Sequence, residues 1–240
     1  MKTVALLCGL GLTLTLTSLS VRAQGTLPGY LQNYTHAFKL KPQQRVYWTG
    51  GADGPIASFS QVKNNAGKVP SDMRFSLFFN IGVATHYDFN SHVGVFSGLN
   101  LKNIGLITRQ DSIRLKRRVY TLGVPLGLKL GDLDQQTFFF LGGQYELALN
   151  YKEKTFIDGH KTGKFNEWFS PRTPLLMPSL FAGFEIRDFS LKFQYYPQPF
   201  FNRDFSQTVH GSQFYPYKDL KANLFFVTFG YNFSTRDTSR

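Results

Sequence analysis

The feature that most constrains the fold is a two-residue alternation of side-chain character between Met73 and Tyr87. The residues at every second position from Met73 are apolar or aromatic, apart from one threonine. The residues between them include Arg74, Asn80 and His86. Successive side chains of a β-strand point to opposite faces, so this spacing predicts a strand with one apolar and one polar face.

The same alternation recurs along the chain, and aromatic residues, at 16%, are abundant as strands prefer. Seven strands are expected, several of them longer than strands of soluble sheets. An eighth should precede Met73, because bacterial single-chain membrane barrels usually have an even number of strands. We expect it at 55–63 rather than at 45–51. The seven strands are expected at 73–87, 92–107, 118–132, 137–152, 176–187, 188–198 and 221–233.

Short and long connections alternate strictly between these strands. Polar turns are expected at 89–91, 131–136 and 187–188, and longer links at 108–115, 153–174 and about 199–219. Transmembrane barrels have turns at one rim and loops at the other. Since no window after residue 24 could form a membrane helix, the sequence predicts an all-β, eight-stranded antiparallel transmembrane β-barrel with short periplasmic turns and longer extracellular loops.

The orientation of the two faces decides between two classes of barrel. A soluble periplasmic ligand-binding barrel would have its apolar residues inside, whereas a membrane barrel has them outside. Strand length and aromatic strand ends (Tyr87, Tyr120, Tyr151, Tyr195, Tyr231 and Phe233) favour the membrane barrel. The polar residues would then fill the lumen: Arg74, His86, Lys102, Lys129, Gln144, Glu146, Glu185, Arg187, Lys192 and Gln194.

The N-terminus resembles a secretory signal peptide. One lysine precedes an apolar run, and Val21-Arg22-Ala23 fits cleavage after Ala23. Cys8, the single cysteine, lies in this segment, so the mature chain would form no disulfide or thiolate site. We therefore expect a bacterial outer-membrane protein with a signal peptide at 1–23, a periplasmic lead-in at 24–54, the barrel at 55–233 and a C-terminal tail at 234–240.

A strongly basic balance, with a formal charge of +12, suggests an anionic partner. For an exported chain this partner is the phosphate of lipopolysaccharide in a Gram-negative envelope, although merely solvated loops are the equal alternative. Nucleic acid is not expected, because no recognition module is present. The loop after Tyr151 adds Lys152, Lys154, Lys161, Lys164 and Arg172. The candidate phosphate contacts are Arg109, Arg114, Lys116, Arg117 and Arg118.

One pair of residues could carry catalysis. His210 and Ser212 are two residues apart, so a strand would place them on one face with His210 able to activate the hydroxyl. The pattern resembles the His-x-Ser of outer-membrane phospholipase and lipid A deacylase barrels, with Asp219 as an orienting acid. Those families usually continue with Asn, whereas Gln213 follows here. A polar extracellular loop is the expected reading, and the lipid hydrolase is the alternative.

No cofactor or metal is expected. His86, Asp88 and His92 flank one turn, where metal binding is conceivable, but a polar rim is the expected role. Glu146 and Glu185 are expected to be ion-paired filler in a cationic lumen rather than catalytic acids. The sequence has no nucleotide-binding fingerprint.

The stretch YTLGVPLGLKLGD followed by FFFLGGQYELALNY resembles the PorT-like outer-membrane barrels of the Bacteroidota. The matching residues are Pro125, Leu126, Lys129, Gly142, Gly143 and Tyr145, with the closing FGYNF as further support. The resemblance spans roughly residues 73–233 and implies a role linked to the type IX secretion system. Here seven residues, STRDTSR, follow the final aromatic residue Phe233. We thus expect a non-enzymatic structural or accessory subunit of an envelope or secretion assembly.

Overall fold

The computed structural model describes residues 45–236 except 66, 77–79 and 210, and the side chains of a few further residues are not described. All regular elements in this part are β-strands, and none of it forms a helix able to cross a membrane. The strands are β1 (Val46–Asn64), β2 (Gly67–Val69), β3 (Ser71–Asp72), β4 (Arg74–Ser76), β5 (Asn80–Asp88), β6 (Val93–Gln110), β7 (Ile113–Asp132), β8 (Thr137–Ile157), β9 (His160–Trp168), β10 (Leu176–Ile186), β11 (Phe189–Tyr196), β12 (Gln207–Val209), β13 (Ser212–Phe214) and β14 (Lys221–Ser234).

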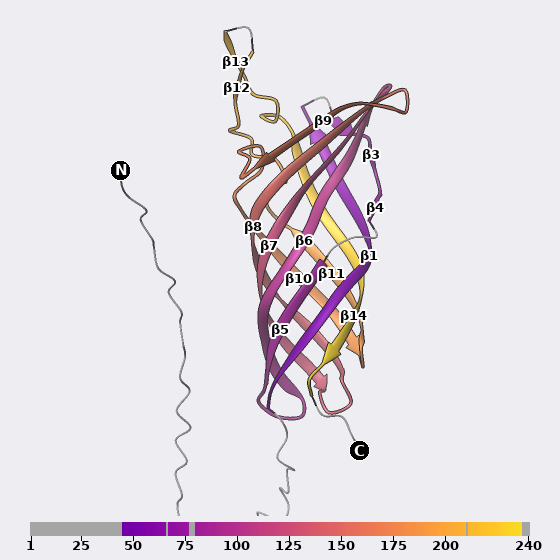
Figure 1. Cartoon of the computed structure of the whole chain (residues 1–240), viewed down its shortest axis with the longest axis vertical. Helices are drawn as coiled ribbons and strands as arrows, with labels where there is room; N and C mark the ends of the chain where they lie inside the picture. The colour runs from indigo at the N-terminus through magenta and orange to yellow at the C-terminus, as the bar shows by residue number, and fades with distance from the viewer. Residues whose placement is uncertain (1–44, 66, 77–79, 210, 237–240) are drawn as a thin grey trace, which may run out of the picture. The chain divides into compact units, whose positions relative to one another are not determined.

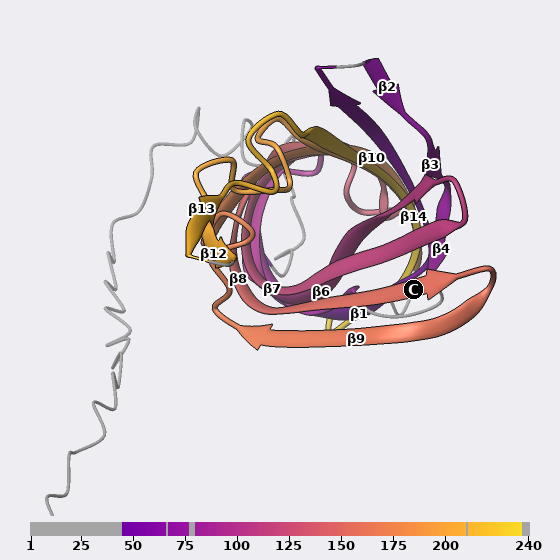
Figure 2. The same ribbon diagram turned by 90° about the horizontal axis from the view of Figure 1, so that it is seen from above.

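Eight strands close into an antiparallel ring in the order β1-β5-β6-β7-β8-β10-β11-β14, with β14 pairing back onto β1 (Figures 1 and 2). The predicted eight-stranded antiparallel barrel is therefore confirmed. The closing register joins Thr49 to Ser234 at one end and Lys63 to Lys221 at the other. Closure leaves no unpaired ladder edge within the ring, which is what a spanning sheet in lipid needs.

The two ends of the ring differ as predicted. One end, the short-turn end, carries the β5–β6, β7–β8 and β10–β11 turns, of which the last is only Arg187–Asp188. The opposite, long-loop end carries β2, β3, β9, β12 and β13 (Figure 1). Arg187 adopts a positive φ of 55° in its two-residue turn and is exposed. Our expectation that it fills the lumen was wrong, because a turn residue lies outside the pleat.

The apolar faces of the ring strands point outward, the reverse of the arrangement in a soluble barrel. Lys129 is fully buried, whereas Leu126, three residues earlier on β7, is 67% exposed. The same contrast holds on β5, where His86 is buried and Val83 is exposed. Outward apolar side chains from many strands form a continuous apolar belt, which includes Trp48, Ile81, Leu99, Leu122, Phe139, Leu141, Tyr145, Leu180, Phe193, Phe229 and Tyr231. The interior of the ring is lined by polar residues together with buried phenylalanines such as Phe138, Phe140 and Phe181.

The first strand is longer than predicted. Both candidate segments, 45–51 and 55–63, fall in β1. On one side β1 pairs with β5 from Val46 to Asp53 and with β4 from Ile56 to Ser58. On the other side it pairs with β14 from Thr49 to Lys63, with a register shift between Asp53 and Ile56. The barrel therefore begins at Val46 rather than at residue 55. Gly50, Gly51 and Gly54 weaken the alternation there, which hid the strand. The predicted signal peptide and most of the lead-in lie outside the described residues.

Two of the expected long loops are instead extended hairpins. β6 and β7 run through residues 108–115 and are joined by Asp111–Ser112 alone, and β8 continues to Ile157 before β9 turns back along it. Figures 1 and 2 show these strands running on beyond the ring. Apart from the outer edge of β9, their backbone groups pair with neighbouring strands, so this basic region is a β-sheet.

A β-bulge on β8 reverses the faces of this extension. Thr121 pairs with Ala148, but Tyr120 pairs with Asn150, so Leu149 is an extra residue. Side chains beyond the bulge shift by one position, since the pleat has a period of two. Tyr151, which we expected on the outer apolar face, is therefore fully buried inside. Conversely, Lys152 and Lys154 face outward.

Candidate functional site

The interior of the barrel is filled by a network centred on Glu146, whose side chain is fully buried. Its Oε1 accepts hydrogen bonds from Lys102 Nζ at 2.8 Å and from the Tyr196 hydroxyl at 2.7 Å. Its Oε2 accepts from the Thr121 hydroxyl at 2.7 Å, and Lys102 also donates to Gln194. These contacts join four strands across the lumen. The ion pair and its hydrogen bonds offset the cost of removing the charges of Lys102 and Glu146 from water. A single unpaired charge buried here would have no such compensation.

A second network closes the short-turn end. The Asp88 carboxylate accepts from Lys129 Nζ at 2.5 Å and from Arg236 Nη1 at 3.0 Å. Lys129 also donates to the Tyr47 hydroxyl at 2.7 Å, and Arg236 to the carbonyl of Leu133 at 2.7 Å. Arg236 belongs to the residues that follow the last strand. The start of the predicted C-terminal tail is thus anchored in the barrel mouth.

We expect Arg236→Ala to lower the free energy of unfolding by about 1.5–3 kcal/mol, the range for hydrogen bonds to charged groups. The loss leaves the Leu133 carbonyl and half of the Asp88 carboxylate without their partner. Urea titration of the protein refolded into phospholipid vesicles measures it. Arg203→Ala, which removes an exposed arginine bonded to one carbonyl, is the matched control and should change stability by less than about 0.5 kcal/mol.

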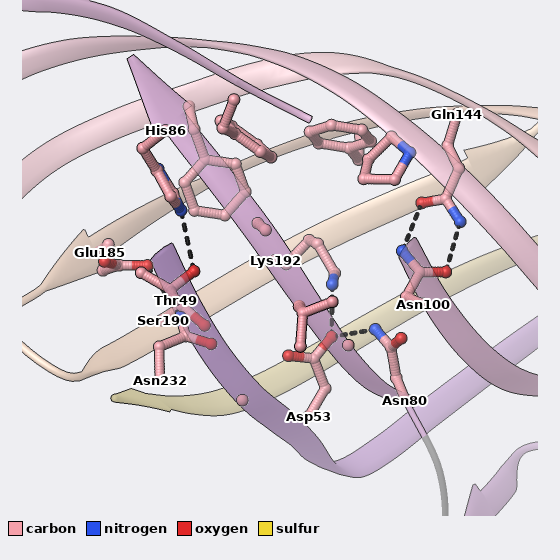
Figure 3. A pocket seen from close by; sticks show the side chains of 18 of the residues that line it. Thr49, Asp53, Asn80, His86, Asn100, Gln144, Glu185, Ser190, Lys192 and Asn232 are labelled. Atoms are coloured by element: carbon pink, nitrogen blue, oxygen red, sulfur yellow. Dashed lines mark hydrogen bonds and ion pairs between the residues drawn. The ribbon is translucent and has the colours of Figure 1, made fainter. Parts of the chain in front are cut away.

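Between these two networks lies a small cavity of about 130 Å³, lined by polar residues and by several phenylalanines (Figure 3). Lys192 and Asn80 both donate to Asp53, and Asn100 and Gln144 exchange hydrogen bonds of 3.3 and 2.7 Å. Ligand pockets usually exceed about 300 Å³, so this cavity is suited to a few water molecules rather than to an organic ligand.

Towards the long-loop end the interior becomes apolar, which the sequence analysis did not predict. Phe200, Phe201 and Tyr217 come from the segment between β11 and β14 and are buried against inward residues of seven strands. Phe201 stacks on Tyr217 with ring centroids 4.5 Å apart. Apolar residues suit this position because they meet Phe200, Phe201 and Tyr217 instead of water. Apart from the small cavity beside Asp53, side chains therefore fill the described part of the lumen.

The charge concentration outside the lumen is on the outer surface of the β7–β8–β9 extension. Two cross-strand pairs join like charges, Lys116 with Lys154 and Arg118 with Lys152, and Lys154 also faces Lys164. Within the described part of the chain, none of these side chains makes an ion pair with a carboxylate. We call this surface the outer basic face; it consists of Arg114, Lys116, Arg118, Lys152, Lys154, Lys161 and Lys164.

Some of the cationic side chains of the outer basic face make cation–π contacts with aromatic rings. Arg114 and Lys116 each lie 5.1 Å from the centroid of the Phe156 ring. Lys152 lies 4.9 Å from the ring of Tyr120, the residue at which the apolar belt meets the basic face. Directly opposed like charges destabilise a sheet, and cation–π contacts at exposed sites recover only part of that cost. The pKa of Lys154 is accordingly lowered, first by the charge of Arg118 and then by partial desolvation and by other lysines.

The structure divides the five predicted phosphate-binding residues. Arg114, Lys116 and Arg118 lie on the outer basic face. Arg117 faces the other way and donates to Glu153 at 2.8 Å, and Arg109 is ion-paired with Asp72 at 3.0 Å. Strand alternation within the run Arg114–Arg118 could have predicted this split; treating the run as a loop obscured it. The bulge at Leu149, which brings β8 lysines to the same face, has no clear sequence signal.

Ser212 and Asp219, two of the three candidate hydrolase residues, lie at the long-loop end. His210 is outside the described residues. Ser212 is exposed on β13 of the small β12–β13 hairpin, and Asp219 is exposed in the segment leading to β14. No hydrogen bond joins Ser212 to Asp219, so the described residues assemble no triad here.

The turn that carries His86, Asp88 and His92 forms part of the short-turn end. His86 is buried and bonds Thr49 at 2.8 Å, whereas His92 is exposed and contacts the Gly131 carbonyl at 3.1 Å. Both oxygens of Asp88 are engaged by Lys129 and Arg236. Within the described residues these three side chains make separate, structural contacts.

Comparison with known proteins gives matches to solved structures only. No family model matches the chain. No curated protein matches it either. Among solved structures, it is similar to Ail, the attachment invasion locus protein of Yersinia pestis, solved with the heparin analogue sucrose octasulfate (14% identity, 78% of this chain and 99% of Ail covered, TM-score 0.34). It is also similar to Neisserial surface protein A (9%, 79% and 98%, 0.34) and to the outer membrane protein OprG of Pseudomonas aeruginosa (13%, 80% and 97%, 0.32).

These neighbours are eight-stranded outer-membrane barrels, and the likeness concerns the fold alone. The resemblance to PorT-like proteins finds no counterpart among them and stays a prediction.

Proposed function

We propose that this chain is a non-enzymatic integral protein of the bacterial outer membrane whose outer basic face binds lipopolysaccharide phosphates. The observation that carries the proposal is that the outer basic face directly continues the apolar belt. The apolar belt ends at Tyr120 on β7, and Arg118, Lys116 and Arg114 follow on the same outward face. In a membrane, that position is the headgroup level of the leaflet next to the long-loop end.

The filled lumen supports an action at the outer surface. The Glu146 network, the Asp88 network and the apolar cluster around Phe201 occupy successive levels of the interior. A pore would need a continuous aqueous path, and a soluble ligand-binding barrel would need an apolar cavity larger than about 300 Å³. The apolar belt also argues against the soluble periplasmic alternative, since outward side chains such as Leu126 and Tyr145 would face water.

Lipopolysaccharide binding should depend on the outer basic face in particular. We expect the triple variant Arg114→Gln, Lys116→Gln, Lys152→Gln, folded in neutral detergent, to bind fluorescent lipopolysaccharide about tenfold or more weakly than wild type, since charge-assisted bonds to phosphate are lost. The matched control is Lys63→Gln, Lys68→Gln, Lys221→Gln, three exposed lysines elsewhere at the long-loop end. An equal loss in both triple variants would mean that net charge alone drives binding.

A second candidate role is that of a structural or accessory subunit of an envelope assembly, the type IX secretion system being the one that the PorT-like resemblance implies. The specific observation in its favour is β9, which pairs with β8 on one side only and carries exposed Phe165 and Trp168. An unpaired strand edge beside exposed aromatic residues suits a protein partner. Mild-detergent purification from native membranes tests this role: co-purifying envelope proteins support it, and purification of the barrel alone contradicts it.

Absence of catalysis is part of the proposal. The alternative, a lipid hydrolase, would use His210, Ser212 and Asp219. Purified protein incubated with phospholipid and with lipid A should release no fatty acid beyond the rate of Ser212→Ala. Release that requires Ser212 would replace the proposed function by the hydrolase.

A further inference from the structure

The outer basic face contains a pocket that the sequence analysis did not identify. Its volume is about 220 Å³. Five cationic side chains line it, from three separate parts of the barrel: Arg74 from β4, Lys116, Arg117 and Arg118 from β7, and Lys154 from β8. Ile107 of β6 forms an apolar part of the wall, and no carboxylate is among the lining residues.

Arg74 distinguishes this pocket from an ordinary charged surface, because its side chain is buried and held in one orientation. Its side chain is buried, at 8% exposure, and its guanidinium donates to Asn103 Oδ1 at 2.9 Å and to the Asn103 carbonyl at 3.4 Å. Our expectation that Arg74 is lumen filler was wrong in this respect, because it lines a pocket with three outward-facing cations. The two bonds to Asn103 orient the guanidinium, yet neither acceptor carries a charge. A buried arginine without a carboxylate partner is costly unless an anion approaches it.

Three further lining residues, Lys116, Arg118 and Lys154, likewise lack a carboxylate partner in the described part of the chain. Lys116 and Lys154 are direct cross-strand partners, and Arg118 is two residues from Lys116 on the same face. Within the described residues none of the three has an acidic partner, whereas Arg117, on the opposite face of the same strand, has Glu153. Of the five cations around this hollow, Arg117 alone has a carboxylate partner within the described residues, so four positive charges remain without one.

We propose that this pocket binds a single phosphate group, a phosphomonoester dianion, by charge-assisted hydrogen bonds from Arg74, Lys116, Arg118 and Lys154. This inference rests on the proposed function and deepens it, since it assigns one phosphate to one place on the outer basic face. A pocket of about 220 Å³ has room for a phosphate with part of its hydration. Arginine suits the site because its planar fork matches two phosphate oxygens.

The test compares pocket cations with a cation on the same face outside the pocket. Arg118→Gln and Lys154→Gln should each weaken binding of a bisphosphorylated glucosamine-disaccharide lipid about tenfold or more, whereas Lys164→Gln should weaken it less than about threefold. All variants are measured by isothermal titration as the full mature chain folded in neutral detergent. Retention of the folded band on unheated gels shows that each variant is folded. Arg118→Lys, which keeps the charge but not the fork, should fall between wild type and Arg118→Gln.

Two further binding measurements distinguish a lipid headgroup from free inorganic phosphate as the source of the bound phosphate. Binding of the lipid that is lost on enzymatic dephosphorylation, together with competition by millimolar inorganic phosphate, supports a phosphate pocket that accepts either source. Loss on dephosphorylation without such competition supports the lipid headgroup as the ligand. Equal weakening by Lys164→Gln and Arg118→Gln overturns the pocket while leaving lipopolysaccharide binding by the whole face intact. Undiminished binding of the dephosphorylated lipid overturns the phosphate assignment.

Discussion

Glu146→Gln should lower the free energy of unfolding by about 3–5 kcal/mol, because it leaves the buried ammonium of Lys102 without its counter-charge. The substitution keeps the shape of the side chain, so lost packing contributes little. The measurement is a urea titration of the protein refolded into phospholipid vesicles, followed by the fluorescence of Trp48 and Trp168. No other single change of charge in the barrel should cost more.

Two comparisons make this expectation specific. Asp72→Asn removes a carboxylate from the exposed pair with Arg109 and should cost less than about 1 kcal/mol. The double variant Lys102→Met, Glu146→Gln should lose less than the sum of its single variants, because the unpaired charge has been removed. If Glu146→Gln and Asp72→Asn had equal effects, the lumenal network would not be a major source of stability.

Leu126→Arg should lower the free energy of unfolding by about 2–4 kcal/mol in lipid, the cost of a cation on the lipid face near the bilayer centre. Leu126 is 67% exposed, so the new side chain meets no steric conflict and the loss reflects the surroundings of the barrel. The same vesicle assay measures it.

The matched control is Ile113→Arg, which introduces the same side chain at an exposed position beyond the apolar belt on the same strand. Surface substitutions in water typically change stability by no more than about 0.5 kcal/mol. Equal, small effects at both positions would indicate that water, and not hydrocarbon, surrounds Leu126.

The fold followed from the sequence where alternation was unbroken. β7 and β14 could be placed by face because each keeps a period of two, and the short turns could be placed because polar residues interrupt it. The single strand expected at 73–87 is instead divided into β4 and β5, and only β5 keeps the expected faces, since Arg74 lines an outer pocket. β1 was misplaced because its glycines remove the contrast between faces. The extension of β6 to β9 was taken as loops, since charged residues outside the membrane carry no apolar alternation.

The candidate site was only partly predictable for a different reason. Arg114, Lys116 and Arg118 share a face by simple strand spacing, but Lys152 and Lys154 join them only through the bulge at Leu149. A one-residue bulge depends on the pairing of two strands and leaves no mark in either strand alone. The pocket required Arg74 as well, which is far from the other cations in the sequence and approaches them only in the closed ring.

The measurement that tests the central claim most directly asks which medium touches the outside of the barrel. In a variant with Trp48→Phe and Trp168→Phe, the single indole introduced by Leu126→Trp should be quenched by phospholipids brominated in their acyl chains and should be insensitive to aqueous iodide. The same background with Phe214→Trp, on exposed β13, should show the reverse. Quenching of the indole at position 126 by iodide but not by brominated lipid would contradict a membrane-spanning barrel.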